Sequence, residues 1–320
     1  MTAAGDGPRS ARQARPPGHL PAAAVVGDVD AGVLRAAGWW VTGRLPTTPY
    51  DDPRDAPAYV DSGELLADDR VDAVALDGAD ARAAGLLPTL RDAGLLVLLV
   101  SPAPLDVDAV REARAVPGPE VAVGLLQRWE PWALTVAAAL PLVESGALQV
   151  TVRGWPRGAA AAAELVDLVR SWCGDVAAVV AAPQALPARS LPGGAEVAWA
   201  LLTSAGATVL VSHDDAPPLV RLSFATARLE AGPLGARWVG GDELPLLPTP
   251  DRRPQPLPAP PGTAPGLVAT AYALLAGVGG GDLDASRWPW PADLGDLLTA
   301  ARVLAALRES AATGSLVRTG

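Results

Sequence analysis

Lysine is absent from this sequence of 320 residues, in which all 25 residues counted as lysine or arginine are arginine. An arginine side chain stays protonated near neutral pH, whereas a lysine can exchange a proton when its surroundings lower its pKa. The absence therefore excludes a Schiff-base lysine, a lysine general acid or base, and the lysine of a phosphate-binding P-loop.

Cysteine and histidine are nearly absent as well. Cys173 is the single cysteine, which excludes an internal disulfide and a metal site built from several cysteines. The two histidines, His19 and His213, lie far apart in the chain, so a histidine-based catalytic triad or zinc site would lack parts. We expect no metal cofactor.

Long apolar runs and excess positive charge are also missing. No apolar run approaches the roughly 20 residues of a membrane-spanning helix, and residues 1–20 carry arginines without the apolar stretch of a secretory signal. The formal net charge of -10 opposes general binding to nucleic acid or to anionic lipid. We expect a disordered tail over 1–20 on a cytoplasmic protein whose partners are small molecules or proteins.

The first half of the chain contains regularly spaced apolar runs. Helix-like stretches separate the strand candidates AAAVV, GWWVTG, VDAVAL, GLLVLLV and EVAVGLL. Strands that are apolar throughout and separated by helices are typical of a parallel sheet covered on both faces. The pattern predicts a Rossmann-like α/β domain over residues 21–126.

The pattern changes in residues 127–320. Consecutive strand candidates follow one another without helices between them, namely AEVAWALLTS, ATVLVSH, LVRLSFATARLE and ARWVGG. Such strands favour a largely antiparallel, open sheet, so we predict an α+β domain. Residues 245–265 are rich in proline, which favours an extended linker within this domain.

This order of segments resembles the Gfo/Idh/MocA family of NAD(P)-dependent oxidoreductases over residues 22–320. DAGLLVLLVSPAPLDVDAVREARA resembles the stretch that holds the family's Glu-Lys-Pro triplet, and SGELLADDRVDAVAL resembles the segment before its fourth strand. VAVGLLQRWEPWALTV resembles the opening of the second domain, with Arg128 and Pro131 in place, and ELVDLVRSWCGDV resembles the helix that ordinarily reads His-x-x-Asp. The resemblance implies an NAD(P) cofactor and a homo-oligomer formed through the C-terminal sheet.

The resemblance places a serine at the family's catalytic lysine. The triplet reads Val100-Ser101-Pro102, so Ser101 stands where the family's lysine exchanges a proton with the substrate hydroxyl. A serine hydroxyl is shorter, uncharged and poorly matched to proton exchange near neutral pH. Losing a positioned general acid or base typically lowers a rate by about 100- to 10,000-fold.

The second-domain helix departs from the family in the same way. The family's aspartate, histidine and aspartate correspond to Ala160, Glu164 and Asp167, so only the last residue type is retained. The spacing puts these residues on one helix face. The candidate catalytic residues are therefore Ser101, Arg128, Glu164 and Asp167. Convergence of Asp77 with the two carboxylates, for acid/base work or cation binding, is one alternative, and a solvated or interdomain polar face is another.

The predicted cofactor loop, GDVDAG, keeps two of the family's three glycines. Gly27 and Gly32 are in place, but Val29 replaces the glycine that lets the backbone approach a pyrophosphate, and we expect its side chain to obstruct that approach. Asp28 and Asp30 add negative charge and are good helix-capping residues.

Three further positions complete the candidate cofactor site. Arg44 ends the second strand, where an arginine can accommodate a 2'-phosphate. Asp77 begins an Asp-Gly turn pair where the family usually has Thr-Pro, and Pro102 is retained from the triplet. The candidate cofactor-binding residues are Gly27, Val29, Gly32, Arg44, Asp77 and Pro102.

The sequence leaves two functional hypotheses and leaves open whether the chain is an enzyme. In the first, it keeps the family's fold without its hydride-transfer chemistry and acts as a binding, regulatory or complex-forming protein. In the second, it is an active NAD(P)-dependent oxidoreductase on a sugar-like or other small hydroxy compound. There Ser101, Arg128 or a cleft carboxylate positions the substrate while water relays the proton. The three lost catalytic positions and Val29 favour the first.

Overall fold

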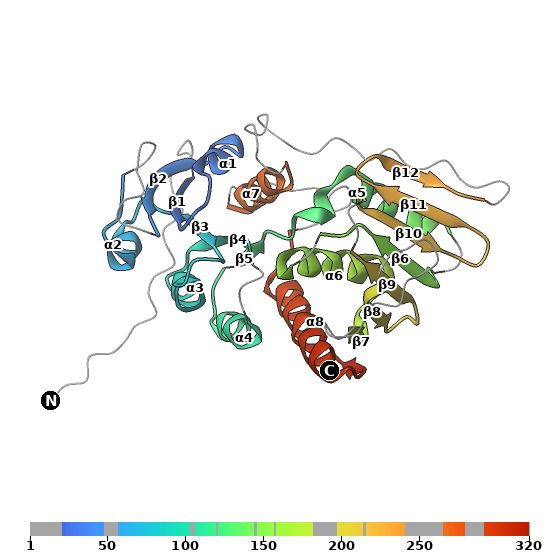
Figure 1. Cartoon of the computed structure of the whole chain (residues 1–320). Coiled ribbons are helices and arrows are strands. Elements are labelled where there is room, and N and C mark those ends of the chain that lie inside the picture. The colour runs from blue at the N-terminus through green and yellow to red at the C-terminus, as the bar shows by residue number, and fades with distance from the viewer. Residues whose placement is uncertain are drawn as a thin grey trace.

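The structure is a computed structural model, and ten stretches of the chain are described in it. They are residues 21–47, 57–102, 106–119, 121–143, 146–156, 158–181, 197–213, 216–240, 265–278 and 291–319. The expected tail at 1–20, and all of the expected linker except residue 265, lie outside these residues. Figure 1 shows the first sheet and the second sheet side by side, with helix α8 (Leu294–Thr313) beneath their junction.

A five-stranded parallel sheet forms the first half of the molecule, as predicted for a Rossmann-like domain. The strand order is β2-β1-β3-β4-β5, and each neighbouring pair is parallel. The apolar runs are buried on both sides, which accounts for their lack of alternation. The strands are β1 (Ala22–Val26), β2 (Trp40–Leu45), β3 (Ala73–Asp77), β4 (Leu96–Val100) and β5 (Val121–Val123).

Four short helices connect these strands, and aspartates begin three of them. The side chains of Asp30, Asp61 and Asp106 accept hydrogen bonds from backbone amides in the first turns of α1, α2 and α4. Each bond satisfies an amide that the helix itself leaves without a partner. The helices are α1 (Ala31–Ala36), α2 (Ser62–Ala67), α3 (Ala83–Asp92) and α4 (Val107–Ala115).

Helix α7 (Pro265–Val278) completes the first sheet from far along the chain. It contacts α1, β4 and β5, and its Leu267, Val268 and Ala271 join the core on that face of the sheet. Trp39 Nε1 donates a hydrogen bond of 2.9 Å to Ala271 O. The domain boundary predicted at residue 126 places α7 in the second domain. In the structure, α7 packs on the first sheet, beside α1 in Figure 1.

The second sheet has eight strands in the order β12-β11-β10-β6-β9-β8-β7-β13. Its neighbouring pairs are antiparallel except for β6 with β9, so the predicted largely antiparallel sheet is confirmed. The strands are β6 (Gln149–Arg153), β7 (Val176–Ala181), β8 (Val197–Thr203), β9 (Thr208–Ser212), β10 (Leu219–Ser223), β11 (Arg228–Gly232), β12 (Gly235–Trp238) and β13 (Val317–Arg318).

Helices cover one face of this second sheet. Val150, Val152, Val209 and Val220 alternate with exposed or half-buried residues and belong to the core cluster shared with the helices. On the opposite face Glu230 of β11 pairs with Arg221 and Arg237 on the neighbouring strands. The covering helices are α5 (Pro131–Ala139), α6 (Ala159–Cys173) and α8 (Leu294–Thr313), with the short 3-10 helix η2 (Leu140–Leu142) after α5.

The two halves meet at the 3-10 helix η1 (Leu126–Trp129) and at α8. Helix η1 contacts both α6 and α7, and α8 contacts α4 of the first half as well as α6 and β7 of the second. One hydrophobic cluster includes buried residues from both halves. None of the described helices is long and apolar enough to cross a membrane.

Candidate functional site at the strand ends and the domain junction

The β1–α1 loop, residues 27–30, begins with Gly27, whose positive φ is a backbone conformation that favours glycine. Gly27 has a φ of +80°, and its amide donates a hydrogen bond of 3.1 Å to Leu45 O. A Cβ added at Gly27 would lie 2.7 Å from Asp77 Cβ and 3.2 Å from Asp80 Oδ2. Backbone and carboxylates therefore approach each other here as closely as a glycine permits.

The rest of the loop is fixed by bonds within the chain. Val29 is 2 % exposed, and its side chain packs into the core beneath α1 and α7. Arg44 Nη2 donates to Val29 O at 2.6 Å. Asp30 Oδ1 accepts from the Gly32 amide at 2.8 Å, so the helix-capping interpretation of Asp30 is confirmed.

Two buried aspartates lie against this loop. Asp77, the last residue of β3, accepts from Ala79 N at 2.9 Å and from Asp28 N at 3.4 Å. Asp80 is paired with Arg82 at 2.6 Å, and this guanidinium holds the pKa of Asp80 below its ordinary value. The two residues are 9 % and 7 % exposed, and Asp77 lies at the carboxyl end of β3.

Ser101 follows β4 at the same edge of the sheet, in a strained backbone conformation. Its φ is +52°, in the left-handed region that residues with a Cβ rarely adopt. A Cβ at Gly78 would lie 2.6 Å from Ser101 O, so the turn after β3 and the turn after β4 are in close contact. The Ser101 side chain is exposed and Pro102 is buried.

Glu164 of α6 binds the backbone of η1. Its two carboxylate oxygens accept from Leu126 N at 2.8 Å and from Gln127 N at 2.9 Å. The two amides begin η1, so the carboxylate caps this helix from a neighbouring element. Burial raises the pKa of Glu164 to about 7, against the opposing effect of the two backbone hydrogen bonds.

Arg128 of η1 forms ion pairs with aspartates of α6 and α8. Its guanidinium is bound by both oxygens of Asp167, with a distance of 2.8 Å from Nε to Oδ2, and it reaches Asp296 of α8 at 3.1 Å. Asp296 also pairs with Arg170 at 3.0 Å. We name Arg128, Glu164, Asp167 and Asp296 the η1 clamp.

The structure thus divides the predicted site residues between two places. Arg128, Glu164 and Asp167 meet in the η1 clamp, while Ser101 and Asp77 lie at the strand ends of the first sheet. Within the described stretches, no three histidine, cysteine or acidic residues form a group that could hold a metal ion. Sequence reasoning missed Asp296, whose one signal is its place in the helix-capping box of α8.

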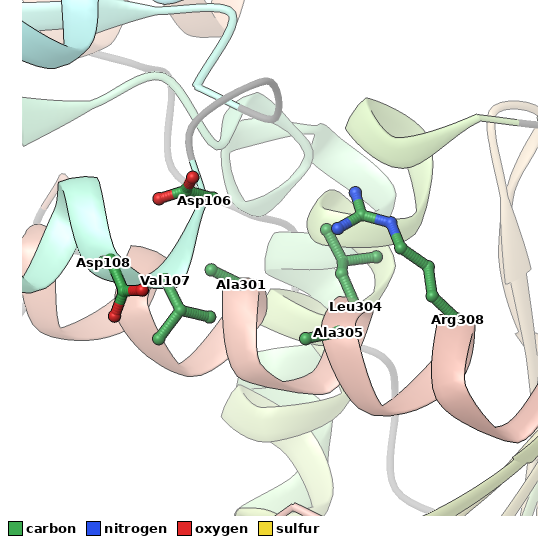
Figure 2. Close-up of a pocket in the computed structure, with 7 residues that line it drawn as sticks. All are labelled: Asp106, Val107, Asp108, Ala301, Leu304, Ala305 and Arg308. Atoms are coloured by element: carbon green, nitrogen blue, oxygen red, sulfur yellow. The ribbon is translucent and has the colours of Figure 1, made fainter.

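A separate hollow lies between α4 and α8, as Figure 2 shows. It encloses about 220 Å³ and contains none of the residues predicted from the sequence to form a site. Its floor is apolar, with aspartates toward α4 and an arginine at the far end along α8. The lining residues are Asp106, Val107, Asp108, Ala301, Leu304, Ala305 and Arg308.

Comparison with known proteins finds similarity in three-dimensional structure. No family model and no curated protein matches the sequence. The WlbA dehydrogenase from Bordetella pertussis, in complex with NADH and UDP-GlcNAcA, is similar with a TM-score of 0.70 and 15% identity, covering 94% of this chain and 99% of that one. An NAD binding oxidoreductase from Klebsiella pneumoniae gives 0.68 and 14%, covering 94% and 100%.

Another similar structure is the aldose-aldose oxidoreductase from Caulobacter crescentus, complexed with glycerol. Its TM-score is 0.66 at 15% identity, with 94% of this chain and 100% of that chain covered. The chain has the fold of the Gfo/Idh/MocA oxidoreductases. The resemblance stated from the sequence is confirmed at the level of the fold, since identities this low carry the comparison no further.

Proposed function

We propose that this Gfo/Idh/MocA-like chain is a non-catalytic homologue that acts in the cytoplasm by binding a small molecule or a protein. The observation that carries the proposal is the η1 clamp. By resemblance, Glu164 stands at the family's catalytic histidine, and its carboxylate is held by the amides of Leu126 and Gln127. A side chain bound to two backbone amides in this way is engaged in holding η1.

The other positions that correspond by resemblance to the family's catalytic residues support the same proposal. Ser101 stands at the position of the family's lysine, and the absence of lysine from the whole chain leaves no neighbouring lysine to take over its role. Asp167 is the one retained acidic position, and it binds Arg128 in the clamp. Loss of even one positioned proton donor or acceptor costs about 100- to 10,000-fold in rate, so losing several leaves little hydride transfer.

A hydride-transfer assay tests the proposal. The purified protein is mixed with NADH or NADPH and a panel of sugar-like carbonyl compounds, and with the oxidised cofactors and the matching hydroxy compounds. We expect no substrate-dependent change in the absorbance of the reduced nicotinamide. A substrate-dependent rate that Ser101→Ala lowers, and that the exposed control Ser204→Ala leaves unchanged, would overturn the proposal.

The second candidate function is an active NAD(P)-dependent oxidoreductase on a sugar-like or other small hydroxy compound. It is favoured by the similar structures that contain NADH or NAD+. In this alternative Ser101, Arg128 or a cleft carboxylate positions the substrate and water relays the proton. The same assay decides between the two candidates, because only this one predicts substrate-dependent turnover.

We also propose that the chain forms a homo-oligomer through the uncovered face of the second sheet. Val180 and Leu202, on the neighbouring strands β7 and β8, are 39 % and 43 % exposed. We expect light scattering to give a mass above that of the monomer, and Leu202→Asp to lower it, because a charge on this apolar surface opposes burial. The control Val60→Asp, on the first domain, should leave the mass unchanged, and a monomeric wild type would contradict the proposal.

A further inference from the structure

The carboxylate of Asp77 lies against the backbone of the β1–α1 loop. In a parallel sheet of this order, the connections from β1 and β3 leave on opposite faces, and dinucleotides bind beyond the carboxyl ends of the strands at such a point. Asp77 ends β3 at this place, and its Oδ2 lies 3.4 Å from the Asp28 amide. A loop amide that would otherwise face a phosphate oxygen therefore faces an oxygen of the chain itself.

Little room separates the carboxylates from the loop. The space that a Cβ would need at Gly27 is taken by Asp77 Cβ, 2.7 Å away, and by Asp80 Oδ2, 3.2 Å away. From the other side, Arg44 is hydrogen-bonded to Val29 O. The Arg44 guanidinium is thus engaged with the loop backbone.

The charges of the two aspartates are balanced differently. Asp80 forms an ion pair with Arg82, which neutralises it locally. Asp77 accepts from the amides of Ala79 and Asp28, and no arginine among the described residues pairs with it. A buried negative charge repels a second anion strongly, because water screens it poorly.

We propose that Asp77 is the residue that excludes dinucleotides from this chain, its carboxylate taking the position of a pyrophosphate oxygen beside the Asp28 amide. The inference deepens the proposed function and rests on it, because it assigns the loss of cofactor to one side chain. It also replaces the steric explanation based on Val29, whose side chain is buried in the core.

Calorimetric titration of NADH and NADPH into the wild type and three variants tests the inference. Asp77→Asn removes the charge at nearly constant size, and Asp77→Ala removes the whole carboxylate. Asp72→Asn is the matched control, because Asp72 accepts from the Ala22 amide at 2.8 Å at the opposite, amino end of β1. Thermal unfolding of each variant confirms that it is folded before titration.

We expect wild-type dissociation constants for NADH and NADPH above about 1 mM. Both Asp77 variants should bind these cofactors at least about tenfold more tightly. Asp72→Asn should bind as weakly as the wild type. Wild-type binding tighter than about 100 μM would overturn the inference. Folded Asp77 variants that gain nothing, or an equal gain in Asp72→Asn, would overturn it too.

Failure of the inference is distinguishable from failure of the proposed function. Wild-type binding without hydride transfer overturns the inference and leaves the non-catalytic function intact. Wild-type turnover overturns the function itself. Weak wild-type binding together with a gain in both Asp77 variants supports both.

Discussion

The carboxylates at the η1 clamp and those at the β1–α1 loop differ in the partners that they have. Asp167 and Asp296 face arginines, and Glu164 faces two amides of a helix that it caps. Asp77 faces amides as well, but at the place where this type of fold binds dinucleotides, and without an arginine among the described residues. The same chemical group therefore stabilises a junction in one region and opposes a ligand in the other.

The largest expected effect comes from breaking the clamp at its arginine. Arg128→Ala leaves Asp167, which is 2 % exposed in its side chain, without its cation. We expect a loss of about 3–5 kcal/mol in the free energy of unfolding, because an uncompensated buried charge is strongly destabilising. Urea unfolding of the variant and the wild type measures it.

An exposed ion pair provides the control for this change. Arg111 and Asp108 pair on the surface of α4, with side chains 57% and 87% exposed. Arg111→Ala should cost about 1 kcal/mol or less. Equal losses in the Arg128 and Arg111 variants would mean that the clamp contributes no more than a surface ion pair.

A smaller effect, dependent on pH, is expected at Glu164. Because burial raises the pKa of Glu164 to about 7 in the folded protein, from 4.5 when unperturbed, its carboxyl group stabilises the fold most when protonated. That contribution is fully present below about pH 4.5 and is lost as the pH rises through about 7. Wild-type stability should therefore fall relative to Glu164→Gln between pH 5 and pH 8, by about 2–3 kcal/mol.

Urea unfolding at one-unit intervals across this range tests the sign as well as the size. Glu112→Gln, an exposed change on α4, should keep the wild-type dependence on pH. If Glu164→Gln also follows the wild-type curve, the Glu164 carboxyl does not titrate as its burial implies.

The smallest effect concerns the strand end rather than the clamp. Ser101 has a φ of +52°, which glycine adopts freely and a β-branched residue adopts at a cost. Ser101→Gly should exceed Ser101→Val in stability by about 1–2 kcal/mol, measured by thermal unfolding. Equal stabilities would show that the backbone at this position relaxes without cost.

Much of the fold could be predicted from the sequence because local patterns determine it. The apolar runs of β1, β3 and β4 match a sheet buried on both faces, and Asp30 and Asp106 cap the helices that follow them. Strand β7 escaped prediction because its VAAVVA run is half alanine, a residue with little preference for strands.

The candidate site was harder to predict, because its partners come from distant segments. Helical spacing places Glu164 and Asp167 on one face of α6, but it does not say what that face meets. The partners are η1 and Asp296, and Asp296 lies more than a hundred residues further along the chain. In the same way, α7 reaches back to cover the sheet that buries Val29.

Glu164, which by resemblance stands at the position of the family's catalytic histidine, forms a structural contact that holds η1. Amide hydrogen exchange at Leu126 and Gln127, measured in the wild type and in Glu164→Ala, tests it most directly. We expect slow exchange of both amides in the wild type and a loss of protection in the variant, with the amides of β1 and β3 unchanged. Equal protection of the two η1 amides in both proteins would contradict it.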